Sequence, residues 1–203
     1  MIPWLLALAA SASAMTPIEA ERAFAADAKS IGQWTAFRKW STDDAVMFAP
    51  QPTNAHDFLK DRKDPAQAID WWPTASWISC DGKAAVNTGG WKRPDGSVGY
   101  FTTVWRRQAD GTWKWIADGG DALKASRPRP AEPVVKRASC DTTPPDDVPT
   151  LSGTGRGGGV ADDRTLGWMW IVQPDGSRHF RVGLWNGSDI DTVIDDAIAA
   201  PTK

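Results

Sequence analysis

The sequence is poor in the residues that most often carry metal, redox and acid–base chemistry. Its 203 residues include two cysteines, two histidines and one tyrosine. The cysteines and histidines show no metal-ligand spacing, so no metal site is predicted, and no cofactor is expected. We expect His56 and His179 to be exposed polar residues rather than catalytic bases.

The sequence also lacks an excess of charge and a long apolar run. Its formal net charge is −2, and the Lys and Arg residues are scattered. A nucleic-acid partner is therefore not expected, because such binding normally needs a basic face. No segment beyond the N-terminus approaches the ~18–20 apolar residues of a transmembrane helix. No integral membrane segment is therefore predicted in the mature chain.

The N-terminal stretch MIPWLLALAASASA is typical of an export signal. An apolar run from Trp4 to Ala10 precedes Ala12-Ser13-Ala14, which fits a small-x-small cleavage site. This pattern predicts a signal peptide over residues 1–14, cleaved near Ala14, and a periplasmic or secreted bacterial protein. No Lys or Arg precedes the apolar run, so a buried amphipathic helix or a misplaced start codon is the alternative interpretation.

The cysteine pair fits the same compartment. In an exported protein a single pair of cysteines usually forms a disulfide. We predict that Cys80 and Cys140 form one, which would attach a proline-rich arm to the strands before it. The alternative is a pair of unrelated buried thiols.

Tryptophan, in contrast, is abundant, with thirteen residues in the chain. Such a set can form a packed core, line a ligand cavity, or present a surface to sugars or bases. In the strand pattern Trp113-Lys114-Trp115, the lysine is expected to point to water, so both indoles are expected to face inward. On the neighbouring strand, either Tyr100 or Trp105 should share that face, but not both, because their parity differs.

The N-terminal part of the chain predicts helices and then a strand. Thr16, Pro17 and Glu19 form the pattern of a capping box at the start of a helix. A second helix is expected over residues 32–40, followed by a strand in DDAVMFAP. A short helix is expected in KDPAQAIDWW, residues 63–72.

The next part has the period of two that strands require. Three turn signals, Asp81-Gly82, Pro94-Asp95-Gly96 and Asp110-Gly111, separate the segments of an antiparallel meander. Helices followed by such a meander predict an α+β fold.

The C-terminal part predicts an arm and a small extension. Residues 126–149 are rich in proline, and GTGRGG from Gly153 is expected to be a flexible connector, because a dinucleotide site would need a strand before it and a helix after it. A hairpin over residues 164–185 should dock on the main domain, because its apolar face would otherwise be an oversized exposed patch. That face consists of Leu166, Trp168, Trp170 and Val172. A final helix is expected in SDIDTVIDDAIAA, with an apolar stripe of Ile190, Val193, Ile194, Ala197 and Ile198.

The segments STDDAVMFAPQP and GYFTTVWRRQADGTWKWIADGGD, with Trp72-Pro73 between them, resemble the nuclear transport factor 2-like superfamily. The similarity is to its bacterial branch of SnoaL-like and ketosteroid-isomerase-like domains, over about residues 17–121. It implies a cone-shaped, strongly curved antiparallel sheet wrapped around N-terminal helices, with a cavity open at one end. The C-terminal extension has no counterpart in that family.

These observations predict four regions. They are a signal peptide (1–14), a nuclear transport factor 2-like domain (15–123), a Pro/Gly-rich arm (124–163) and a hairpin-helix extension packed on the main domain (164–203).

Two carboxylates are candidates for catalysis. Asp118 and Asp121 end the last meander strand, and a carboxylate against indole rings would have a raised pKa and could act as a general base. The alternative is a solvated strand end with Gly119-Gly120 as a turn. Strand alternation places Asp118 on the Lys114 side, away from the cavity, unless a bulge reverses the phase.

The leading functional hypothesis is an exported protein that binds a small hydrophobic molecule in a tryptophan-lined cavity. The expected ligand-binding residues are Trp72, Trp77, Asn87, Trp91, Tyr100, Trp113 and Trp115. The first alternative is an isomerase- or lyase-type enzyme that uses Asp118 or Asp121 with Tyr100. The second is a structural or dimerisation module of the cell envelope, and a homodimer is compatible with either. An open cavity of about 300 Å³ or more would favour binding over the structural role.

Overall fold

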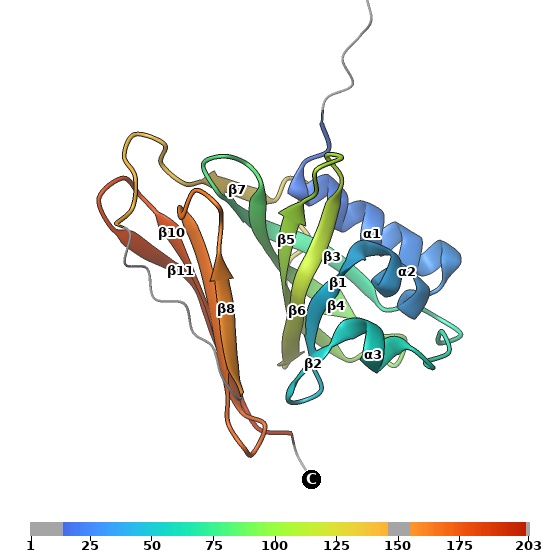
Figure 1. The fold of residues 1–203 in the computed structure, drawn as a ribbon. Helices are drawn as coiled ribbons and strands as arrows, with labels where there is room; N and C mark the ends of the chain where they lie inside the picture. Colours follow the sequence, from blue (N-terminus) through green and yellow to red (C-terminus); the bar gives the residue numbers. More distant parts are fainter. Residues whose placement is uncertain (1–13, 146–154, 202–203) are drawn as a thin grey trace, which may run out of the picture.

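A computed structural model describes residues 14–145 and 155–201. Apart from Ala14, the expected signal peptide lies outside the described residues. Within the described part the chain forms three layers (Figure 1): helices, a large curved sheet, and a second, smaller sheet on the opposite face. The expected α+β class is confirmed.

The helices begin where the sequence signals them. In α1 (Pro17–Ile31), the Glu19 backbone N–H donates to Thr16 Oγ1 at 3.2 Å, and the Thr16 N–H donates to Glu19 Oε2 at 2.7 Å. This capping box satisfies N–H groups that have no partner within the helix. Helix α2 (Gln33–Trp40) follows directly, because Gly32 takes a φ of 104° at the junction.

The expected helix over residues 63–72 is wrong. Asp70 already begins strand β3 (Asp70–Ile78), and the residues before it are irregular. The short helix of this region, α3 (Ala55–Leu59), lies earlier, where Asn54 Oδ1 accepts from the Asp57 N–H at 3.0 Å. The adjacent indoles of Trp71 and Trp72 point to opposite faces of the sheet, which a strand allows and one side of a helix does not.

The large sheet has seven strands in the order β2-β1-β6-β5-β4-β3-β7. Besides β3, its strands are β1 (Ser41–Phe48), β2 (Pro52–Asn54), β4 (Ala84–Lys92), β5 (Val98–Arg107), β6 (Trp113–Leu123) and β7 (Val134–Arg137). The expected meander runs from β3 to β6, but the sheet is mixed rather than wholly antiparallel. Strand β1 pairs in parallel with β6, and β7 pairs in parallel with β3. In both pairs the two strands are far apart in the chain, and a parallel pair requires such a long connection.

The C-terminal part forms a four-stranded antiparallel sheet in the order β11-β10-β9-β8. Its strands are β8 (Arg156–Val160), β9 (Leu166–Val172), β10 (Arg178–Trp185) and β11 (Ile190–Ile198). The expected final helix is therefore wrong. A spacing of four, as between Ile194 and Ile198, fits one side of a helix and one face of a strand equally well, and the β-branched residues of this segment favour the strand.

The glycine-rich segment is also an edge strand rather than a free connector, from Arg156 onward. Gly157 and Gly159 lie opposite Trp170 and Trp168 of β9, and a Cβ on either glycine would stand 2.5–2.6 Å from an indole carbon. The absence of side chains therefore lets the two indoles fold across β8.

The two sheets share one apolar core. The face expected to dock, Leu166, Trp168, Trp170 and Val172, is buried against Val86 and Val104 of the large sheet. A second core cluster, with Phe24, Ala36, Trp105 and Trp115, fills the space between the helices and the other face of that sheet.

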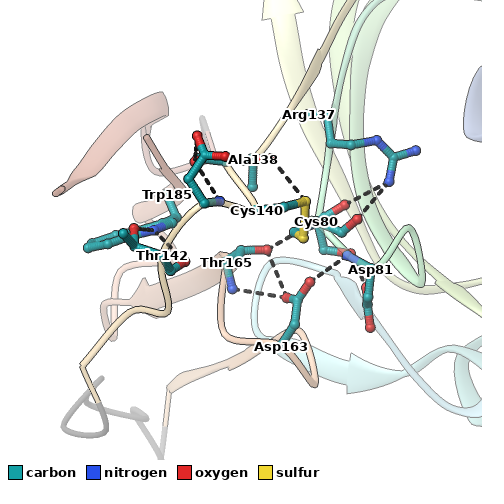
Figure 2. Close-up of a disulfide and its surroundings, with 12 residues drawn as sticks. Cys80, Asp81, Arg137, Ala138, Cys140, Thr142, Asp163, Thr165 and Trp185 are labelled. Atoms are coloured by element: carbon teal, nitrogen blue, oxygen red, sulfur yellow. Dashed lines mark hydrogen bonds between the residues drawn. A yellow bond between two sulfur atoms is a disulfide. The ribbon is translucent and has the colours of Figure 1, made fainter. Parts of the chain in front are cut away.

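The predicted disulfide is present (Figure 2), with 5.3 Å between the Cα atoms of Cys80 and Cys140. The Cys80 N–H donates to Thr165 Oγ1 at 2.8 Å, and Arg137 donates to the Cys80 carbonyl at 2.9 Å. The bridge therefore joins the segment after β3 to the segment after β7, and the Cys80–Thr165 hydrogen bond ties both to the turn before β9.

Candidate functional site

A cavity of about 450 Å³ lies between the helices and the large sheet and opens to solvent. Six aromatic side chains from five elements line it between the helices and β3 to β5: Phe24, Trp34, Phe37, Trp71, Trp91 and Phe101. Edge-to-face contacts hold several of these rings together, with centroid distances of 4.8 Å for Phe24–Phe37 and 4.9 Å for Phe24–Trp71. Such contacts fix the rings around the cavity.

Asp118 faces this cavity because of an irregularity in β6. Trp105 of β5 pairs with Trp115, but Val104 pairs with Ala117, so Ile116 is an extra residue on β6. This bulge reverses the alternation beyond it. The expectation that Asp118 lies on the Lys114 side, away from the cavity, is therefore wrong.

The Asp118 carboxyl has one hydrogen bond from the described residues, from Thr103 Oγ1 to Oδ1 at 2.6 Å. Burial raises the pKa of Asp118 to about 7. The Thr103 hydrogen bond and the positive charge of Arg178 lower this pKa, but by less than burial raises it. At neutral pH the protonated and ionised forms of Asp118 are therefore both populated.

A second carboxyl in the wall, Glu21 of α1, was not predicted. It is fully buried and accepts hydrogen bonds at 2.9 Å from the indole Nε1 atoms of Trp71 and Trp105. The Asn87 amide donates to it at 3.2 Å. Burial raises the pKa of Glu21 to about 7, against the three hydrogen bonds, which lower it.

The sequence did contain a signal for Glu21. It lies three residues before Phe24 and seven before Ala28, on the buried stripe of α1. A glutamate at such a position needs several buried donors. Which donors reach it depends on strands that follow much later in the chain.

The expected ligand-binding residues on the helix side have different roles. Trp91 lines the cavity, and its Nε1 donates to the Tyr100 carbonyl at 2.9 Å. Trp113 and Trp115 face inward as expected, but they belong to the packed core and do not line the cavity. Asn87 is buried beside Glu21 and likewise does not line the cavity.

Two expected ligand-binding tryptophans lie away from the cavity. Trp72 packs against the arm, where its Nε1 donates to the Pro128 carbonyl at 2.9 Å. Trp77 packs against the core between the two sheets.

Tyr100 borders the cavity, but its side chain belongs to the opposite face of β5. Its ring lies 4.6 Å from the Arg127 guanidinium, and the neighbouring Thr102 donates to Asp196 of the second sheet at 2.9 Å. Burial and the charges of Asp196 and Asp121 raise the pKa of Tyr100 above its usual range. The structure therefore does not bring Tyr100 together with Asp118. Asp121 is the cross-strand neighbour of Tyr100 and lies at the cavity wall.

The second sheet contributes one residue to the cavity. Arg178 of β10 donates from Nη2 to the Gly120 carbonyl at 2.7 Å, and its guanidinium lies 4.9 Å from the Phe48 ring. Gly119 gives room to the Phe48 ring beneath this guanidinium, because a Cβ there would stand 3.0 Å from a carbon of that ring. Nothing in the local sequence pattern indicated that a residue of the C-terminal extension would reach this cavity.

The histidines take no part in this site. His56 shares a 2.9 Å hydrogen bond with Ser41, and His179 lies 3.1 Å from Asp195 on the second sheet. Within residues 14–145 and 155–201, no group of three or more His, Cys, Asp or Glu residues could hold a metal ion. No helix in this part of the chain is long and apolar enough to cross a membrane.

Comparisons with known proteins give distant structural similarity only. No family model matches the chain, and no curated protein matches it significantly. A candidate ketosteroid isomerase from Parabacteroides distasonis is 21% identical, with a TM-score of 0.42, over 53% of this chain and 85% of its own. A candidate aromatic ring hydroxylase from Novosphingobium aromaticivorans is 17% identical, with a TM-score of 0.38, over 54% of this chain and 87% of its own. The α+β architecture agrees with the resemblance described above, and these values establish neither a family nor an activity.

Proposed function

We propose that this protein binds a small, largely apolar molecule in the cavity between the helices and the large sheet. The observation that carries the proposal is the open space of about 450 Å³ within fixed aromatic walls. Ligand pockets typically measure about 300–1,000 Å³ and combine apolar walls with a few polar groups. The cavity is larger than the volume of about 300 Å³ above which a binding role is favoured over a purely structural one.

The proposal includes export. The pattern of residues 1–14 favours a signal peptide, and a disulfide is typical of proteins that fold in an oxidising compartment. We therefore place the binding function in the periplasm or outside the cell.

Tryptophan fluorescence tests this function, because Trp34, Trp71 and Trp91 line the cavity. We expect saturable quenching by neutral, naphthalene-sized aromatic compounds, and Trp91→Leu should weaken binding by about tenfold, or about 1.4 kcal/mol. Trp77→Leu is the matched control, because Trp77 packs on the other side of the sheet. Equal loss of binding in both variants would contradict the proposed site.

A second candidate is acid–base catalysis of the isomerase or lyase type. The observation that favours it is the Asp118 carboxyl, which faces the cavity with a pKa raised to about 7. The test is turnover of cyclic ketones by the wild-type chain and by Asp118→Asn. Turnover that is lost in this variant while ligand binding is retained would establish the enzyme.

A further inference from the structure

We propose that the natural ligand of the cavity is an organic cation, whose apolar body carries one protonated nitrogen placed beside Asp118, with the buried Glu21 behind the cavity wall. This inference rests on the proposed function, because it requires the same cavity to bind a small molecule. It adds the charge of the ligand and the carboxyl group that recognises it, Asp118.

The first argument is that two carboxyl groups line the cavity and neither is neutralised by a salt bridge within the described residues, although the charge of Arg178 lowers the pKa of Asp118. Neither Asp118 nor Glu21 forms a salt bridge with any of the described residues, and the charge of Asp118 raises the pKa of Glu21. The two basic side chains of the cavity wall have other contacts. Arg93 stacks on Trp91 at 4.6 Å, and Arg178 contacts Phe48 and the Gly120 carbonyl.

The second argument is that Asp118 has an acceptor to offer. Thr103 donates to Oδ1, and none of the described residues donates to Oδ2. Oδ2 is not fully buried either, so it remains accessible from the cavity. An ammonium group there would gain a charge-assisted hydrogen bond.

The third argument is the aromatic wall. Trp71, Trp91 and Phe101 line the same cavity as the two carboxyls. The faces of such rings attract cations. An anion beside Asp118 would be repelled by the ionised carboxylate, and a neutral ligand would leave Oδ2 without a charged donor.

The inference predicts a pH dependence of binding. The charged groups that face Asp118 are Glu21 from α1 and Arg178 from β10, with Asp121 of β6 and Arg93, directly after β4, also in the cavity wall. Below about pH 7 a cation must displace the proton of Asp118. Its affinity should therefore rise with pH, until the amine itself loses its proton near the range of lysine, about pH 10.

The experiment is calorimetric titration of the full mature chain, with the disulfide intact, using three probes of one shape. These are 1-naphthylmethylamine, 1-naphthylmethanol and 1-naphthoate. At about pH 8 we expect the amine to bind at least about tenfold more tightly than the alcohol, and the naphthoate to bind most weakly. Between about pH 6 and pH 8 the affinity of the amine should rise, while that of the alcohol should not.

Variants assign the effect to the carboxyl. Asp118→Asn should weaken binding of the amine by at least about tenfold and change binding of the alcohol by less than about twofold. Asp44→Asn, which changes an exposed aspartate of β1, should leave both affinities unchanged. If Asp118→Asn does not fold, the pH series with amine and alcohol on the wild-type chain gives the same test.

The outcomes separate the two proposals. Tighter binding of the alcohol or the naphthoate than of the amine overturns the cation inference and leaves the binding function standing. Equal affinities for amine and alcohol at about pH 8 would also overturn the cation inference and leave the binding function standing. Failure of all three probes to bind saturably overturns both.

Discussion

At the scale of single residues, the unusual feature is a glutamate in the centre of an aromatic cluster. Burying a carboxylate is costly unless donors surround it. Glu21 is surrounded by two indole N–H groups and one amide, so three later strands supply what one helical residue needs. These hydrogen bonds hold Trp71 and Trp105 in place, and the charge of Glu21 changes with pH near neutrality.

We predict that Glu21→Gln stabilises the protein relative to the wild type as pH rises. Burial raises the pKa of Glu21 from 4.5 to about 7, so between these values the folded state holds more protons than the unfolded state. The free energy of unfolding then falls with rising pH, by up to about 1.4 kcal/mol per pH unit for this group. Glutamine has no proton to lose.

Urea unfolding at about pH 5, 6.5 and 8 measures the difference between variant and wild type. Glu132→Gln, at an exposed position in the arm, is the control and should show no such trend. A constant difference between Glu21→Gln and the wild type across this range would contradict the prediction.

At the scale of elements, the edge strand β8 depends on residues without side chains. Trp168 and Trp170 fold their indoles across Gly159 and Gly157 on the partner strand. This covers an edge of the second sheet and buries two large apolar groups at once. The sequence of this segment predicts a loop, because glycine-rich runs are rare in strands.

We predict that Gly159→Ala lowers the free energy of unfolding by about 1–3 kcal/mol, the usual cost of overpacking. The new Cβ would stand 2.6 Å from a carbon of the Trp168 ring, which is held between the two sheets. Gly167→Ala on the neighbouring strand is the matched control, because its nearest neighbour would be a carbonyl oxygen at 3.8 Å. Thermal unfolding of both variants provides the measurement, and equal effects would refute the packing argument.

At the scale of the whole molecule, the C-terminal part is joined to the rest by a shared core, by the disulfide and by Arg178. The core between the sheets buries Leu166, Trp168 and Trp170. The Cys80–Cys140 bridge closes a loop of 60 residues, beyond which the chain continues into the second sheet. Because Arg178 reaches the cavity, loosening of the second sheet is expected to weaken ligand binding as well.

We predict that the double variant Cys80→Ser/Cys140→Ser loses about 4 kcal/mol of stability, the chain-entropy value for a loop of this length. The variant should still fold, since strand pairing and the shared core remain. Urea unfolding of the variant, and of the wild type with and without reductant, gives the measurement. A loss below about 1 kcal/mol would show that the unfolded chain gains little freedom when the bridge is removed.

Much of the fold follows from local signals in the sequence. The capping box at Thr16, the turns of the meander and the alternating face of β9 each depend on a few neighbouring residues, and all three predictions are confirmed. The disulfide was also predicted, because only one pairing of two cysteines exists. The final strand was mistaken for a helix, since the spacing of Ile194 and Ile198 fits both periods.

The cavity was decided by the tertiary structure. One extra residue at Ile116 turns Asp118 from one face of β6 to the other, and nothing in the local pattern fixes where a strand bulges. Glu21, Asp118 and Arg178 belong to three elements far apart in the chain, and only the packing of helix, sheet and second sheet brings them to one cavity. The sequence alone determined the turns, the caps and the faces that must be buried, because these depend on backbone conformation and burial along a short segment. The site depends on long-range register and packing, which short segments do not encode.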